Sequence, residues 1–305
     1  MRIVFIGQAP FGREALEALL AQGEQVVGVI TVEDPPTPRY PNPVKACADE
    51  HDIPVYQANF LKKPEAVSWV KALDPDLLVL AFVTAFVPQE MIDLADHGGI
   101  NYHPSLLPKY RGGSAINWAI INGETETGVT IHFIDEGVDT GPILLQEKVD
   151  IMPDDTVKTV YFDKLYPLGI RMIAEAVKQI REGTAAATVQ DESGASFQPV
   201  ITAADTVIDW SQSTHRIYNL IRGANPSPGA VTSYDGNTCK LFDAAVAERT
   251  GAAGEILAAD DAGFTVATGD GAITILSAQI PGQKKQSASA FIESTGLKPG
   301  TKLGQ

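Results

Sequence analysis

The sequence predicts an α/β fold: a Rossmann-like open, mostly parallel sheet, followed by a small C-terminal β-barrel that is OB-like. Two observations favour the sheet. Short apolar runs alternate with helical patterns, and the chain starts as strand (2–6), turn, helix (13–22) and strand (25–30). One observation favours the barrel, since short strands with Gly-rich turns follow one another beyond residue 205.

The first turn, residues 7–12, lacks the G-x-G-x-x-G spacing, so a dinucleotide site is not favoured there. Residues 31–43 hold five prolines and one basic residue, Arg39, which predicts a loop. That loop is either a surface connection or a substrate-facing segment. The later elements of the first part are expected as helices over 44–51, 64–73, 89–95, 114–122 and 155–183, and strands over 54–56, 76–83, 100–103, 127–134 and 143–149.

The pattern changes after Gly183. Residues 184–203 are small and polar and predict a linker that crosses the surface. We therefore expect a first domain at 1–183, the linker at 184–203 and the barrel domain at 204–305. The barrel is expected to contain a helix over 213–222 and strands over 229–234, 238–246, 254–257, 264–268 and 272–279.

Charge and composition restrict the classes of function. The 305 residues carry a net charge of −15, with about −13 on residues 1–203 and −2 on residues 204–305. Such an acidic chain is not expected to bind DNA or nucleic acid in general, although a local basic patch could dock an RNA. Two distant cysteines, no signal peptide and no apolar run of membrane-spanning length predict a cytoplasmic protein without a membrane partner.

The stretch from Gly98 to Leu145 carries the candidate chemistry. Asn101 and His103 alternate along a strand, so they should point the same way at its carboxyl end, where ligands bind in open α/β sheets. The Asp139-Thr140-Gly141 turn follows the next strand and could bring a carboxylate back to the imidazole. An amide, a titratable ring and an acid are suited to acyl transfer.

Other candidates are weaker on sequence grounds. Asp135 and Glu136 compete with Asp139 but continue directly from a strand, which suggests exposure. Four histidines lack polar company and are expected to be structural or solvent-facing: His51, His97, His132 and His215. No metal-ligand cluster, G-x-S-x-G motif or Cys–His pair is evident, so no metal site is expected.

The run HPSLLPKYRGGSAINW, the VDTG turn and the segment NP-x-PGA at 225–230 resemble the enzymes that use 10-formyltetrahydrofolate. The resemblance covers nearly the whole chain. Residues 1–183 resemble the formyltransferase catalytic domain, and the C-terminal part is similar to the barrel domain of methionyl-tRNA formyltransferases. The catalytic part is also similar to the hydrolase domain of 10-formyltetrahydrofolate dehydrogenase, and NGETETGVTIH resembles sugar formyltransferases.

The resemblance implies that Asn101, His103 and Asp139 are the catalytic residues and that 10-formyltetrahydrofolate is the formyl donor. It also implies a folate-contacting turn and a loop that lines a pterin pocket. The turn is Ser105, Leu106, Leu107 and Pro108, and the loop residues are Ala85, Phe86 and Val87.

The residue types fit this chemistry. When an amine attacks the formyl carbon, an oxyanion develops, to which Asn101 and a protonated His103 can donate hydrogen bonds. Asp139 is expected to keep the imidazolium charged, since a nearby carboxylate raises the pKa of a histidine.

The acceptor stays open between alternatives. Initiator methionyl-tRNA is favoured by Asn101 and the C-terminal domain, since the related hydrolase domain has an aliphatic residue at that position. An amino sugar or amino-acid derivative would suit the acidic surface and the loop with one basic residue. Hydrolysis of the folate and a non-catalytic folate or RNA binder are the remaining readings.

Overall fold

The computed structural model describes residues 1–83 and 85–304, so Thr84, which precedes the expected pterin loop, and Gln305 lie outside the description. The chain forms two compact units. Unit 1 comprises residues 1–111, 128–149 and 164–197, and unit 2 comprises 112–127, 150–163 and 198–305. None of the helices in the described part is both long enough and apolar enough to cross a membrane.

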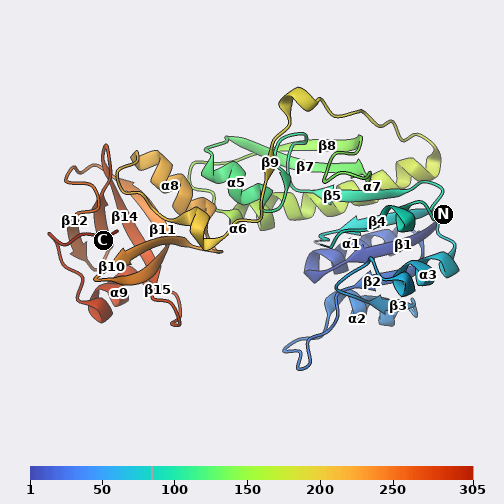
Figure 1. Ribbon diagram of the computed structural model, residues 1–305, viewed down its shortest axis with the longest axis horizontal. Coiled ribbons are helices and arrows are strands. Elements are labelled where there is room, and N and C mark those ends of the chain that lie inside the picture. Colours follow the sequence, from blue (N-terminus) through green and yellow to red (C-terminus); the bar gives the residue numbers. More distant parts are fainter. Residues whose placement is uncertain (84, 305) are drawn as a thin grey trace. The chain divides into compact units, whose positions relative to one another are not determined.

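A seven-stranded sheet runs through unit 1 in the order β3-β2-β1-β4-β5-β7-β8 (Figure 1). Neighbouring strands from β3 to β5 are parallel, whereas β7 pairs with β5 antiparallel, so the expected mostly parallel sheet is confirmed. The strands are β1 (Arg2–Gly7), β2 (Gln25–Thr31), β3 (Val55–Gln57), β4 (Leu77–Ala81), β5 (Gly99–His103), β7 (Glu126–Phe133) and β8 (Ile143–Asp150).

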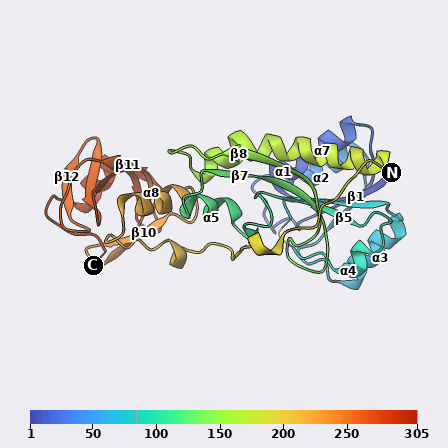
Figure 2. The same ribbon diagram turned by 90° about the horizontal axis from the view of Figure 1, so that it is seen from above.

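Helices cover both faces of this sheet, with α1 and α7 on one side and α3 and α4 on the other (Figure 2). The buried side chains of β1 and β4 alternate accordingly, and Val4, Ile6 and Leu78 pack in the core beneath α3 and α4. The bounds are α1 (Ala9–Ala21), α2 (Pro43–Glu50), α3 (Pro64–Leu73), α4 (Gln89–Ile92) and α7 (Tyr166–Glu182).

The single helix expected over 155–183 is divided. The Thr156 side chain caps a short α6 (Val157–Thr159), a π-helical turn follows over Val160–Leu165, and α7 then starts with a proline in its first turn. A proline is tolerated there because the first N–H groups of a helix have no intrahelical partner. The helix ends at Gly183, which has a φ of +69°.

Unit 2 contains a six-stranded sheet whose strand pairs are antiparallel, in the order β10-β11-β14-β13-β12 with β15 beside β14. Its core includes Trp210, Phe264 and Phe291. The strands are β10 (Ala230–Tyr234), β11 (Asn237–Ala247), β12 (Ile256–Asp260), β13 (Gly263–Ala267), β14 (Ala272–Gln279) and β15 (Gln286–Ser287), and the helices are α5 (Ala115–Ile121), α8 (Thr214–Gly223) and α9 (Ala288–Thr295).

The expected linker is more than a surface crossing. It holds a short 3-10 turn, Glu192–Gly194, and the strand β9 (Phe197–Gln198), which pairs with β6 (Arg111–Gly112), and a second 3-10 turn, Ala203–Thr206, begins at its last residue. Within it Gln190 is only 5% exposed, although its neighbours in sequence are exposed. A polar side chain this deeply buried needs hydrogen-bond partners.

Candidate active site

Strand β5 presents two of the predicted residues on one face. Asn101 and His103 alternate with Tyr102, whose ring packs against Phe11 at a centroid distance of 4.5 Å. The antiparallel register with β7 sets Asn101 opposite His132 and His103 opposite Thr130. The polar side chains of two neighbouring strands therefore meet on the same face of the sheet.

Asp139 lies in the loop between β7 and β8, where its backbone has a φ of +55°. The turn is built tightly: a Cβ added to Gly141 would lie 1.8 Å from the Phe133 carbonyl oxygen. Asp135 belongs to the same turn, because its Oδ1 accepts hydrogen bonds from the Thr140 hydroxyl (2.6 Å) and the Gly137 N–H (3.1 Å). Asp135 thus shapes the loop, and Asp139 supplies the inward carboxylate.

The structure brings the three predicted catalytic side chains together. Asp139 Oδ2 lies 3.5 Å from His103 Nδ1, and Asp139 Oδ1 lies 3.3 Å from Asn101 Nδ2. The side chains of His103 and Asp139 are 6% and 13% exposed. An amide, an imidazole and a carboxylate thus share one buried position at the carboxyl end of β5.

His132 also belongs to this cluster, contrary to the expectation that it is structural or solvent-facing. Its Nε2 lies 3.2 Å from Asn101 Nδ2 and 3.4 Å from Asp139 Oδ1, and its Nδ1 lies 2.8 Å from the Phe133 carbonyl oxygen. A proton on Nδ1 leaves Nε2 as an acceptor for the Asn101 amide. The signal that could have found His132 is that two strands each carry polar residues at alternate positions, Asn101 and His103 on one and Thr130 and His132 on the other.

Burial sets the charge state of His103. Its Nε2 lies 2.8 Å from the Tyr110 carbonyl oxygen, which favours a proton on that nitrogen. Desolvation lowers the pKa of His103 below its usual 6.5 and outweighs the opposing effects of Asp139 and of the Tyr110 carbonyl. The expectation that Asp139 keeps the His103 imidazolium charged is therefore wrong for this structure. The ring is neutral near pH 7, because desolvation of the buried imidazolium outweighs its attraction to the single carboxylate at 3.5 Å.

The predicted folate-contacting turn follows β5 directly. Ser105 and Leu107 are buried, whereas Leu106 and Pro108 are half-buried. The turn is held by Thr130, whose hydroxyl donates to the Ser105 carbonyl (2.6 Å) and accepts from the Leu107 N–H (3.3 Å). Its shape is therefore fixed by the same strand that carries His132.

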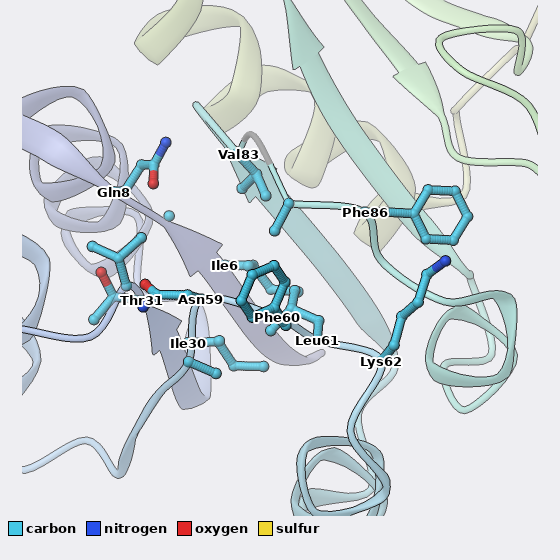
Figure 3. Close-up of a pocket in the computed structure, with 14 residues that line it drawn as sticks. Ile6, Gln8, Ile30, Thr31, Asn59, Phe60, Leu61, Lys62, Val83 and Phe86 are labelled. Atoms are coloured by element: carbon cyan, nitrogen blue, oxygen red, sulfur yellow. The ribbon is translucent and has the colours of Figure 1, made fainter.

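The residues of the predicted pterin loop lie in two different environments. Ala85 and Phe86 line a cavity of about 570 Å³, whereas Val87 is 6% exposed and packs in the core beneath α3 and α4. In Figure 3 the Lys62 ammonium lies beside the Phe86 ring, at 4.5 Å from its centroid. The cavity lies at the carboxyl ends of β1, β2 and β4 and is lined by Ile6, Gly7, Gln8, Ile30, Thr31, Val32, Ala58, Asn59, Phe60, Leu61, Lys62, Val83, Ala85 and Phe86.

Neither the turn 105–108 nor the three catalytic candidates line that cavity. The two predicted groups of donor-binding residues follow the neighbouring strands β4 and β5. Among the described residues, no three or more His, Cys, Asp or Glu side chains are grouped as metal ligands. Cys47 and Cys239 are buried, and burial raises the pKa of each thiol to about 11.

Comparison with known proteins assigns the family. Residues 1–177 match the formyl transferase family model, and residues 200–296 match the model of the formyl transferase C-terminal domain. The methionyl-tRNA formyltransferase of Geobacter sulfurreducens is 40% identical over 309 residues, which cover 100% of this chain and 97% of the relative. That of Pelotomaculum thermopropionicum is 38% identical over 312 residues, covering 100% of this chain and 99% of the relative.

Solved structures show the same fold. The Helicobacter canadensis N-formyltransferase, in complex with folinic acid and dTDP-3-aminofucose, aligns with a TM-score of 0.69 at 20% identity, over 90% of this chain and 97% of the other. The phosphoribosylglycinamide formyltransferase of Bacillus halodurans aligns over 59% of this chain and 95% of its own, with a TM-score of 0.52 at 30% identity. On both sequence and structure, this chain belongs to the formyl transferase family.

Proposed function

We propose that this enzyme transfers the formyl group of 10-formyltetrahydrofolate to the amino group of initiator methionyl-tRNA. The convergence of Asn101 and His103 on the Asp139 carboxylate, at 3.3 and 3.5 Å, carries the proposal for the chemistry. The acceptor is taken from full-length relatives of about 40% identity that are named methionyl-tRNA formyltransferase. A cytoplasmic location follows from a substrate of protein synthesis.

In this proposal the attacking amine passes its proton to the Asp139–His103 pair while the formyl oxygen becomes negative. The ring then bears protons on both nitrogens, facing the Tyr110 carbonyl on one side and the carboxylate and oxyanion on the other. The Asn101 amide is the second donor to the oxyanion. The pair returns the proton to the folate nitrogen as the carbon–nitrogen bond breaks.

The donor is proposed to contact Ser105, Leu106, Leu107 and Pro108, together with Ala85, Phe86 and Val87. The rigid turn held by Thr130 suits a flat ring system, because its backbone groups are already fixed by hydrogen bonds. We further assign the transfer chemistry to residues 1–183 and expect residues 204–305, after the linker, to serve the acceptor.

A small amine is the second candidate acceptor. Residues 1–203 carry a net charge of about −13, and the loop at 31–43 has one basic residue, Arg39, to meet a phosphate backbone. Both features reduce the electrostatic attraction of a polyanion.

One assay decides between these functions. The purified protein is given 10-formyltetrahydrofolate with methionyl-tRNA, with a panel of amino sugars and amino acids, or with no acceptor, and each product is identified by mass spectrometry. Formylated methionyl-tRNA is the expected product, and it should fall at least about 100-fold in His103→Ala. A formylated small amine alone, or formate alone, would overturn the proposed acceptor.

A further inference from the structure

We propose that Gln190 and Arg111 form a clamp that positions Asp139 for catalysis, which rests on the proposed role of Asp139 in formyl transfer. Gln190 comes from the segment expected to be a plain linker. Neither residue touches the imidazole of His103 or the Asn101 amide in any hydrogen bond described above, so both would act through the loop that carries the carboxylate.

Gln190 grips the catalytic loop through its side-chain amide. Its Nε2 donates to the carbonyl oxygens of Asp139 (2.9 Å) and Gly141 (2.7 Å), which uses both of its hydrogens. The two carbonyls flank Thr140, so the grip spans the sharpest part of the turn. A left-handed φ of +55° at a residue with a side chain is costly, and such strain persists where surrounding contacts hold it.

Arg111 holds Gln190 from behind. Its Nη2 and Nε donate to Gln190 Oε1 at 2.7 and 3.2 Å, and the guanidinium is also paired with the exposed carboxylate of Glu192 at 2.7 and 2.9 Å. Arg111 is 7% exposed. The oxygen of the Gln190 amide is thereby directed at the arginine, and its nitrogen at the loop.

The same short segment also sets the His103 ring. Tyr110, next to Arg111, presents its carbonyl oxygen to His103 Nε2 at 2.8 Å, and its own N–H donates to Ser196 Oγ at 2.8 Å. Arg111 N–H donates to the Ser196 carbonyl, also at 2.8 Å. Residues 110–111 therefore hold the His103 ring directly, and they hold the Asp139 carboxylate through Gln190. One short segment thus determines the distance between His103 and Asp139.

The substitution Gln190→Glu tests the clamp. A glutamate keeps an oxygen for Arg111 but cannot donate to the two loop carbonyls. We expect kcat for formyl transfer to fall roughly 10- to 100-fold, the loss typical of removing hydrogen bonds to buried groups, with the KM of the donor changed less than about threefold. The matched control is Gln25→Glu, the same change at an exposed position at the start of β2, which should leave kcat unchanged.

A double-mutant cycle separates positioning from general destabilisation. If Gln190 acts through Asp139, adding Gln190→Glu to Asp139→Asn should lower kcat by less than about twofold more. Multiplying losses would overturn the proposal. Arg111→Lys, which keeps the charge beside Glu192, is the second variant if Gln190→Glu fails to fold. Its loss of kcat should likewise be nearly absent when Asp139→Asn is already present.

A readout that needs no acceptor keeps this test apart from the proposed function. In the NMR titration of the His103 ring, the uncharged variant Gln190→Met should move the His103 pKa further down, because a displaced Asp139 raises that pKa less. An unchanged His103 pKa would overturn the clamp, whichever amine is formylated. Failure to formylate methionyl-tRNA with an altered His103 pKa in the variant would overturn the acceptor alone.

Discussion

At the residue scale, the Asn101 amide has a fixed orientation. Its nitrogen faces two acceptors, His132 Nε2 at 3.2 Å and Asp139 Oδ1 at 3.3 Å. Turning the amide over would place its oxygen against a carboxylate, so the hydrogen-bond pattern selects one arrangement. Both amide hydrogens thus have acceptors, so donation to the oxyanion in the proposed reaction exchanges one of these acceptors for the formyl oxygen.

Asn101→Ile is expected to lower formyl transfer about 100- to 1,000-fold, the effect of losing one oxyanion donor. It should also raise the ratio of hydrolysis to transfer, because Asp139 Oδ1 and His132 Nε2 then lose the amide and can orient water. Formate and formylated product are measured in the same reaction. His103→Ala should lower both products together, and an unchanged ratio in Asn101→Ile would remove the argument for transfer over hydrolysis.

His103 makes stability depend on pH. Burial lowers its pKa in the folded protein below the 6.5 of an exposed histidine, so between these two values the unfolded chain binds the extra proton. The free energy of unfolding should therefore fall as the pH drops below about 6.5, and level off below the folded pKa. Urea unfolding of wild type and His103→Asn at pH 7.5 and 5.5 checks this, since the variant should lose less stability on acidification.

At the element scale, the β5–β7 pair and the loop after β7 make the site. The antiparallel register places Asn101 opposite His132, and the return loop carries Asp139 back over them. The loop achieves this in few residues because Gly141 passes close to the Phe133 carbonyl. A small residue is thus required by backbone contact rather than by chemistry.

Gly141→Ala should displace this loop, since its Cβ would meet the Phe133 oxygen at 1.8 Å. We expect transfer to fall at least about tenfold and stability to fall by about 1–3 kcal/mol, as for other strained substitutions. Activity and thermal unfolding are the measurements. Gly194→Ala is the control, because its Cβ would make an ordinary 3.6 Å contact with Pro108. Equal behaviour of the two variants would contradict the close-approach argument.

At the scale of the whole molecule, charge is unevenly distributed along the chain. Residues 1–203 hold 15 basic and 28 acidic side chains, whereas residues 204–305 hold 8 and 10. A tRNA acceptor must therefore be bound through a limited number of phosphate contacts.

With methionyl-tRNA as acceptor, kcat/KM should fall as salt is raised, with a logarithmic slope of about 0.7–0.9 per phosphate contacted. A small-amine acceptor should give a nearly flat salt dependence, because no counterions are released. The rates are compared at saturating donor over a series of KCl concentrations. A flat response with tRNA would contradict recognition of its backbone.

Much of this molecule is readable from its sequence. Strand alternation predicts that Asn101 and His103 share a face, and the apolar runs predict the central strands. His132 is missed because the register of paired strands is not written in local periodicity. Gln190 is missed because its partners lie 49 and 51 residues away, beyond the reach of any local pattern. The helix α9 is missed because eight residues give a weak period.

The clamp has a consequence for synthesis of the chain. Asp139 precedes Gln190 by 51 residues, so the ribosome releases the carboxylate well before the amide that anchors its loop. Until Gln190 emerges, the turn has the hydrogen bonds of Asp135 but lacks the two that Gln190 donates. In the proposed clamp, the contacts that position Asp139 are therefore completed only after the seven strands of the first sheet have been synthesised.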